Sequence, residues 1–195
     1  MAIKQKPKAV PVLKLPFEID IEQLLLHSRQ VHLTGVICEK TVQPVINQLM
    51  ALQLISDDPI VMWINSGGGY LPDGFALVDA IRMSKVPIYT VIRGQACSMA
   101  AIISIAGHRR LMTENSQWMA HDIQAFVGDY GDKIKARAEV IAKWQKQVFD
   151  FWAENTKLTP KDLEQARHEE LWLNPTECLE KGIVDQIFRT ERVKK

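Results

Sequence analysis

The fold class is indicated most directly by one stretch, PIVMWINSGGGY at residues 59–70. Residues 59–65 are almost continuously apolar, as is typical of a strand buried on both faces of a parallel sheet. A glycine loop is expected at 65–70, followed by a helix over 71–84 and a second apolar strand over 87–92. A strand, a helix and a strand in this order predict an α/β protein built on a parallel sheet.

The alternation of strands and helices continues on both sides of this unit. Further strands are expected at 30–35, 109–113, 116–121, 171–174 and 184–188. Further helices are expected at 41–55, 96–107, 132–155 and 175–181, with one more beginning at Thr159. Pro44 is expected in the first turn of its helix, and Thr159, Pro160 and Asp162 are typical of a capped helix start. The whole pattern predicts helices packed on a central sheet.

The composition argues against several classes of protein. A chain of 195 residues with 47% hydrophobic and 24% charged residues suits one globular domain with a sizeable core. The net charge of +1 gives no reason to expect a nucleic acid or a membrane surface as partner. No apolar run approaches the roughly 20 residues of a membrane span, and the N-terminus lacks the apolar core of a signal peptide.

The cysteines and histidines do not form a metal-binding pattern. Cys38, Cys97 and Cys178 are far apart and odd in number, so we expect reduced, packed thiols rather than disulfides or metal ligands. The five histidines are scattered along the chain. We therefore expect a cytoplasmic protein that holds no metal and needs no other cofactor.

Two glycine-containing segments are the candidates for chemistry, the loop at 65–70 and GQACSMAA at 94–101. Each follows an apolar strand, and open α/β sheets place their sites at the carboxyl ends of strands. Consecutive glycines expose backbone N–H groups, which suits an anion or an oxyanion. Ser98 would lie in the first turn of a helix, where the helix dipole favours a negatively charged nucleophile, although a plain N-cap also explains a serine there.

A serine nucleophile needs a base, and the base needs an orienting carboxylate. His121 ends an apolar strand and is the best placed histidine, although a lone histidine at such a position is more often structural. For the carboxylate, the pattern alone offers Asp122, Glu169, Glu170 and Asp185 and does not choose among them.

Three stretches resemble the ClpP serine peptidase family in the same order: INSGGGYLPDGFALVDAIRMSKVPIYTVIRGQACSMAA, AGHRRLMTENSQWMAH and ELWLNPTECLEKGIVDQI. The most specific of them contains the family's G-x-A-x-S-M-[AG]-A nucleophile turn, here residues 94–101. By this resemblance Ser98 is the nucleophile, His121 the base and Glu170 the third triad member. The resemblance also implies an oxyanion hole made by the N–H groups of Gly68 and Met99, and substrate binding at Gly69, Phe126 and Val127.

The resemblance implies the rest of the organisation as well. The fold would be the ClpP/crotonase-like spiral of ββα units with a protruding helical handle at about 132–155. A single peptidase domain would span 18–188, between an extended basic arm at 1–17 and a tail at 189–195. The activity would be acyl transfer on peptides or unfolded proteins, inside a homo-oligomeric chamber of stacked rings, typically heptameric, supplied by an AAA+ unfoldase.

Several positions depart from the family's pattern. Glu170 stands where the family has Asp, Gly67 replaces a proline, and Asp122-Ile123 follows His121 where the family has Gln-Pro. The segment between Ser98 and His121 is about two residues shorter than usual, which indicates a divergent member. Three other functions stay open at this point: a non-catalytic ring scaffold, a phage head-maturation peptidase, and a crotonase-like acyl-CoA enzyme.

Overall fold

The computed structural model describes residues 21–126, 128 and 130–189, so the arm at 1–17 and all but the first residue of the tail lie outside it. The strands are β1 (Gln30–Ile37), β2 (Ile60–Gly69), β3 (Ile88–Cys97), β4 (Arg109–Thr113), β5 (Gln117–Ala120), β6 (Leu171–Leu173) and β7 (Gln186–Phe188). The helices are α1 (Ile21–His27), α2 (Glu39–Gln53), α3 (Leu71–Arg82), α4 (Met99–Ser104), α5 (Gly131–Asn155), α6 (Pro160–His168) and α7 (Pro175–Glu180).

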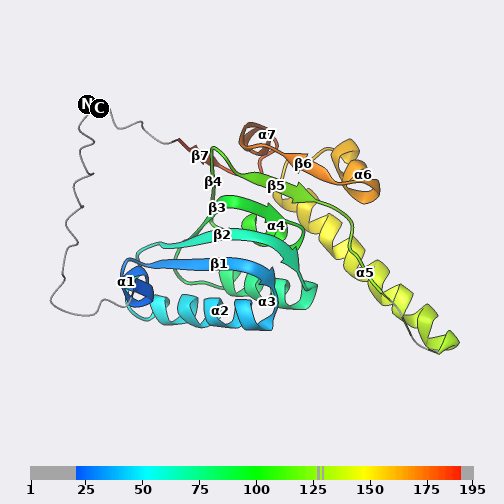
Figure 1. The fold of residues 1–195 in the computed structure, drawn as a ribbon, viewed down its shortest axis with the longest axis horizontal. Coiled ribbons are helices and arrows are strands. Elements are labelled where there is room, and N and C mark those ends of the chain that lie inside the picture. The colour runs from blue at the N-terminus through cyan, green and yellow to red at the C-terminus, as the bar shows by residue number, and fades with distance from the viewer. Residues whose placement is uncertain (1–20, 127, 129, 190–195) are drawn as a thin grey trace, which may run out of the picture.

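The described strands form one mixed sheet, which confirms the predicted α/β class. The order β1-β2-β3-β4-β7 is parallel throughout, as the apolar run at 59–65 predicted. Helices α2 and α3 lie together along one side of β1 and β2, and α4 lies between the sheet and α5 (Figure 1). Burial alternates along β1 and β2, because every second side chain points into this helical layer.

Strand β3 has two neighbours on one side, and this division shapes the site. Residues 89–92 pair with β4, whereas residues 95–97 pair with β5. Gly94 lies between the two segments with φ +97, and a Cβ there would lie 2.7 Å from Oδ1 of Asn65. The glycine therefore lets one strand bend from one partner to the next without ending.

Other local predictions need correction. The helix expected from residue 96 begins only at Met99, because pairing with β5 keeps Ala96 and Cys97 in strand β3. The glycine loop expected at 65–70 is largely the end of β2, which stays paired with β1 as far as Gly69. Helix α2 begins at Glu39, so Pro44 lies in its second turn rather than its first.

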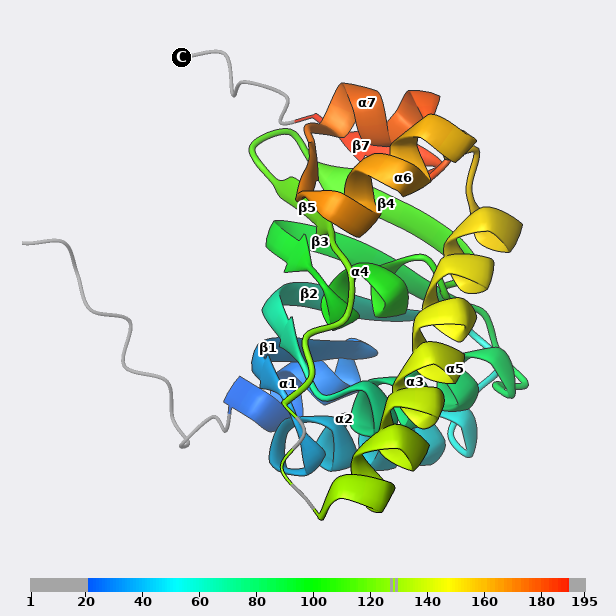
Figure 2. The ribbon, with the colours of Figure 1, turned by 90° about the vertical axis from the view of Figure 1, so that its right-hand side faces the viewer.

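Helix α5 projects from the body of the molecule, as the expected handle would (Figures 1 and 2). Its C-terminal turns enter the core through Val148, Phe149, Phe151 and Trp152. The turns of α5 before these are largely exposed and keep apolar side chains in solvent, including Ile134 (43% exposed) and Trp144 (42%). Among the described residues of α5, buried side chains are thus found only at its C-terminal end.

The C-terminal elements are tied to the sheet by Arg110 on β4. Its Nη1 donates to the carbonyls of Asn155 and Gly182 at 2.9 and 2.8 Å, and its Nη2 pairs with Oδ1 of Asp185 at 2.5 Å. Helix α6 begins with the predicted capping box, in which Thr159 Oγ1 accepts from the N–H of Asp162. One arginine therefore joins the end of α5 and the approach to β7.

Candidate active site

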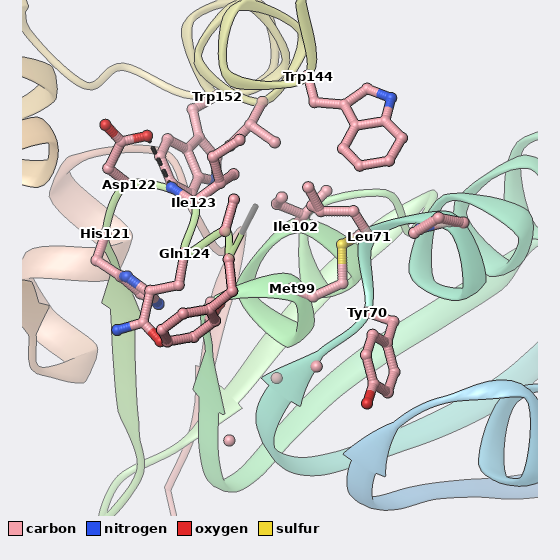
Figure 3. Close-up of a pocket in the computed structure, with 18 residues that line it drawn as sticks. Tyr70, Leu71, Met99, Ile102, His121, Asp122, Ile123, Gln124, Trp144 and Trp152 are labelled. Atoms are coloured by element: carbon pink, nitrogen blue, oxygen red, sulfur yellow. Dashed lines mark hydrogen bonds between the residues drawn. The ribbon is translucent and has the colours of Figure 1, made fainter. Parts of the chain in front are cut away.

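A cleft of about 620 Å³ opens where β2, β3 and β5 end, with α5 lying across it (Figure 3). It brings together most of the site residues predicted from the sequence: Gly68, Gly69, Ser98, Met99, His121 and Phe126. Glu170 does not line it, and Val127 lies outside the described residues. The opening is thus at the carboxyl ends of the strands, as expected for a parallel sheet.

Ser98 is held in a strained turn between β3 and α4. Its φ of 55° and ψ of −121° lie outside the regions that L-residues favour, and Arg29 is the one other described non-glycine residue with positive φ. The backbone N–H of Ser98 donates to the carbonyl of Met119 at 2.8 Å, which fixes the turn against β5. Such conformations cost of order 1–3 kcal/mol and cluster at functional sites.

The hydroxyl of Ser98 does not cap the helix that follows it. Ser98 stands at the N-cap position of α4, yet its side chain makes no capping hydrogen bond. Within the described part of the chain, no other hydrogen bond engages this hydroxyl either. The geometry therefore does not support the interpretation of Ser98 as a plain N-cap.

The glycines at the end of β2 allow a very close approach to this turn. Gly68 has φ +99, and a Cβ there would lie 2.7 Å from Cβ of Ser98 and 3.1 Å from the backbone nitrogen of Met99. Met99 is the first residue of α4, so its N–H has no acceptor within its own helix. The two predicted oxyanion donors thus belong to neighbouring segments beside the serine.

One of these donors already has a partner. The N–H of Gly68 donates to Oγ of Ser66 at 3.1 Å, and the Ser66 hydroxyl donates to the carbonyl of Gly35 at 2.5 Å. Ser66 is 1% exposed, so this contact is built into the β1–β2 pair. Ser66 was not predicted as a site residue, although it stands in the glycine segment at 65–70.

The register of β5 and β6 points to Glu170 as the carboxylate nearest to His121. Strands β5 and β6 are antiparallel, with partners Trp118↔Leu173, Met119↔Trp172 and Ala120↔Leu171. The pairing ends there, and the same register continued by one residue would set His121 against Glu170; residues at opposed strand positions have Cβ atoms about 4.5–5.5 Å apart. The register singles out Glu170 from the four carboxylates that the sequence pattern left open.

The three side chains are not joined by hydrogen bonds. Among the described residues, no hydrogen bond links Ser98 to His121 or His121 to Glu170. Oε2 of Glu170 instead accepts from Nε1 of Trp172 at 2.7 Å. The structure thus brings the predicted residues to one edge of the sheet without connecting them as a chain of donors and acceptors.

The rival carboxylates are engaged elsewhere. Asp122 points away from His121 in Figure 3, and its carboxylate accepts from the side chain of Gln145 on α5 and from the N–H of Ile123. Asp185 lies at the β4–β7 edge. Burial acts to raise the pKa of Asp185, but the hydrogen bonds and charge of Arg110 outweigh it and hold the pKa below its usual value.

The charge of Glu170 affects the thiol of Cys97, the residue before Ser98. Burial, and secondly the negative charge of Glu170, raise the pKa of the Cys97 thiol. Cys97 pairs with Met119 on β5, and Met119 pairs with Trp172 on β6. The field of the carboxylate therefore extends across β5 to the residue that precedes Ser98.

The walls of the cleft are mostly apolar. Leu71, Met99 and Ile102 face Trp144 and Trp152 of α5 across the opening in Figure 3. Neither tryptophan was predicted as a site residue, because the crossing of α5 over the strand ends is a tertiary feature. The described residues hold no group of three or more His, Cys, Asp or Glu side chains suited to a metal ion. None of the described helices is both long and apolar enough to cross a membrane.

Comparison with known proteins identifies the family of this chain. Residues 16–191 match the model of the Clp protease family. The ATP-dependent Clp protease proteolytic subunit 1 of Chlamydia muridarum is 32% identical over 173 residues, covering 86% of this chain and 90% of that protein. The corresponding subunit 2 proteins of Pseudomonas aeruginosa and Treponema denticola are each 30% identical, over 84% and 86% of their lengths. The chain therefore belongs to the Clp protease family.

Proposed function

We propose that the chain is a serine endopeptidase that cleaves peptide bonds by acyl transfer. Ser98 attacks the peptide carbonyl while His121 takes its proton, and Glu170 orients the imidazole and stabilises the imidazolium. The N–H groups of Gly68 and Met99 bind the oxyanion. Family membership supports peptidase chemistry over acyl-CoA chemistry, since the relatives are named as proteolytic subunits.

The observation that carries this proposal is the strained turn at Ser98. A positive φ at a non-glycine residue is costly, and here it presents a hydroxyl with no described hydrogen-bond partner to a cleft lined by His121. The glycine at 68 lets the end of β2 approach Ser98 more closely than any side chain would allow. A nucleophile needs an unengaged hydroxyl with backbone donors close by, and a structural serine does not.

Two local adjustments complete the proposed site. His121 must turn so that one ring nitrogen reaches Ser98 and the other reaches Glu170, and hydrogen bonds of this kind often form only when substrate is bound. The N–H of Gly68 must exchange Ser66 for the oxyanion, which carries full charge and is therefore the stronger acceptor. Both changes are rotations of side chains or of one peptide group.

We propose that an extended peptide binds beside Gly69 and the segment at 125–127. Phe126 is fully exposed at the cleft, and an apolar side chain of the substrate would enter between Met99 and Trp144. We propose a peptide or an unfolded protein as the substrate, because a cleft of about 620 Å³ holds a few side chains and not a folded domain.

We further propose a homo-oligomeric ring, probed most directly by sedimentation velocity. The exposed apolar side chains Ile134, Val140 and Trp144 of α5 form more apolar surface than one free helix should present to water. Stacked heptamers with an enclosed chamber and an AAA+ unfoldase as partner follow from the family and complete the proposal. A stable monomer at micromolar concentration would contradict the ring.

Reaction with diisopropyl fluorophosphate tests the nucleophile. We expect intact-mass spectrometry to show one adduct, mapped to Ser98 and absent from Ser98→Ala. Ser98→Ala should also lose about 10⁶ in kcat on a fluorogenic peptide while keeping its fold and assembly. Near-normal turnover by this variant would overturn the assignment.

A second candidate, a non-catalytic ring subunit, is favoured by one observation. Ser98, His121 and Glu170 make no hydrogen bonds to one another within the described structure. In that case the fluorophosphonate would leave the chain unmodified, and the chain would serve only to complete a ring with active partners.

A further inference from the structure

We propose that Trp172 is a positioning residue for the reaction, because its indole N–H holds the carboxylate of Glu170 beside His121. The inference rests on the proposed serine peptidase function and adds a residue to which the sequence motifs assigned no role. Nε1 of Trp172 donates to Oε2 of Glu170 at 2.7 Å, a short hydrogen bond to a charged acceptor. A carboxylate has two oxygens, so Oε1 is left for the imidazole.

The strand register explains how one tryptophan can do this. Residues two apart in an extended segment point to the same face, so Glu170, which directly precedes β6, lies on the same face as Trp172, the partner of Met119. Continued by one residue, this register sets His121 across from Glu170. The indole therefore holds the carboxylate from the side, along its own strand, while His121 lies across from it. The two contacts use different oxygens and do not compete.

The length of the side chain fits this arrangement. Trp172 is two strand positions from residue 170, a separation of about 6.6 Å, which only a long side chain can span. Shortening Glu170 to Asp would withdraw the oxygens by about 1.5 Å and break a 2.7 Å hydrogen bond. The indole anchor thus gives a physical reason for Glu at a position where the family has Asp.

An anchor matters here because Glu170 is exposed. A free, solvated Glu side chain would spread over many rotamers, and holding one of them has an entropic cost. The other charged or titratable groups near His121 are arranged differently. Asp122 is held by Gln145 on α5, Glu169 closes α6, and the buried Cys97 lies on β3. Among these described groups, Glu170 alone is set against His121 when the strand register is continued by one residue.

A double-mutant cycle on peptide hydrolysis tests the anchor. Trp172→Phe keeps a half-exposed aromatic ring and removes only the N–H, so we expect kcat to fall about tenfold with KM changed less than about twofold. In a Glu170→Asp background the anchor is already lost, and Trp172→Phe should cost less than about twofold further. Equal losses in both backgrounds, or no loss in the Glu170 background, would overturn the inference.

Trp63→Phe is the matched control. Nε1 of Trp63 donates to Oε1 of Gln30 at 2.9 Å. The variant therefore loses the same kind of indole hydrogen bond, but between β2 and β1. We expect its kcat and KM to stay within about twofold of the parent chain. A loss equal to that of Trp172→Phe would mean that any such change disturbs the sheet, and it would also overturn the inference.

A second readout does not depend on peptidase activity. Diethyl pyrocarbonate modifies the imidazole ring, so its rate at His121, mapped by mass spectrometry at one fixed pH, responds to a change in the groups beside that ring. We expect this rate to change in Trp172→Phe, and not to change further when Trp172→Phe is added to Glu170→Asp. An unchanged rate in Trp172→Phe would refute the anchor even if Ser98 proved not to be a nucleophile.

Discussion

The two sides of the cleft are built in different ways. The nucleophile side, residues 67–69 and 98–99, is continuous with long parallel strands, and its backbone segments touch so closely that a Cβ on Gly68 would overlap Ser98. The base side, His121 and Glu170, follows or precedes strands of only four and three residues. One side is held by the core, and the other is held by a short antiparallel ribbon.

Because of this difference, the two sides should respond differently to substitutions. On the nucleophile side, Ser98, Gly68 and Met99 are fixed by backbone, so the geometry changes only if the backbone moves. On the base side, His121 and Glu170 are placed by register alone, and their side-chain orientation depends on single hydrogen bonds such as that of Trp172. We therefore expect changes on the nucleophile side to be all-or-none and changes on the base side to be graded.

Gly68→Ala should show the largest effect on the nucleophile side. The new Cβ would lie 2.7 Å from Cβ of Ser98 and 2.8 Å from the carbonyl oxygen of Cys97, at a φ of +99 that alanine disfavours. The turn must shift, and we expect kcat/KM on a peptide to fall by about 10³ or more, comparable to the loss of an oxyanion donor.

Gly67→Ala is the control for this change. Its Cβ would lie 3.7 Å from Nε2 of Gln95, an ordinary contact, and its φ is outside the left-handed region. We expect its activity to stay within about threefold of the parent chain. Comparable losses in both variants would show that the nucleophile side is not held as tightly as its contacts indicate.

Glu170→Gln should produce the next largest effect, on the base side. Gln cannot supply the negative charge that stabilises the imidazolium, so kcat should fall by roughly 10²–10⁴ with KM little changed. Asp122→Asn and Asp185→Asn, measured on the same peptide, should each cost far less, because those carboxylates bind Gln145 and Arg110. If Glu170→Gln stayed within about threefold while either Asn variant lost its activity, the third triad member would have to be reassigned.

The same contrast separates what the sequence predicts from what it does not. Long apolar strands and their glycines are local patterns, so β2, β3 and the segment around Ser98 could be located without a structure. The role of Gly94 could not be predicted, because the sequence does not show that β3 exchanges one neighbour for another there. The choice of Glu170 by register needed the pairing of β5 with β6, a contact between residues about 50 positions apart.

The cap of a helix could be predicted from the sequence, but which of the side chains of α5 the core buries could not. The capping box at Thr159 follows from three residues in a row of four, and the structure confirms it. The burial of Val148 and Trp152 beside the exposure of Ile134 depends on where α5 leaves the core, which no periodicity reveals. Helix α1 was not expected at all, since its seven residues are too few for a clear periodic signal.

Arg110→Ala should weaken the attachment of the C-terminal elements to β4 without changing a residue that lines the cleft. It removes the hydrogen bonds to the carbonyls of Asn155 and Gly182 and the ion pair with Asp185, so we expect the free energy of unfolding at pH 7 to fall by about 2–3 kcal/mol. Because the pKa of Asp185 is held below its usual value, this stabilisation is complete above about pH 4 and is lost as the pH falls further.

Denaturant unfolding at several pH values measures this loss in the free energy of unfolding. The difference between Arg110→Ala and the parent chain should be constant from about pH 5 to 8 and should shrink below about pH 4. Lys146→Ala is the control, since its pair with Asp150 is exposed on α5 and should contribute less than about 1 kcal/mol. A gap that widened in acid would contradict the assigned sign.

The smallest expected effect connects the two sides, because the thiol of Cys97 lies on one and the charge of Glu170 on the other. Burial and then that charge raise the pKa of Cys97, so Glu170→Gln should lower the pKa and speed alkylation of Cys97 by iodoacetamide at a fixed pH near 8. Cys38 provides an internal reference: its half-exposed thiol has a pKa lowered first by a side-chain hydrogen bond with Thr41, and it should react fastest in every variant. Cys178, whose pKa burial raises to about 12, should hardly react. An unchanged rate at Cys97 in Glu170→Gln, relative to Cys38, would mean that the carboxylate does not face the nucleophile side and that the register alone misplaces it.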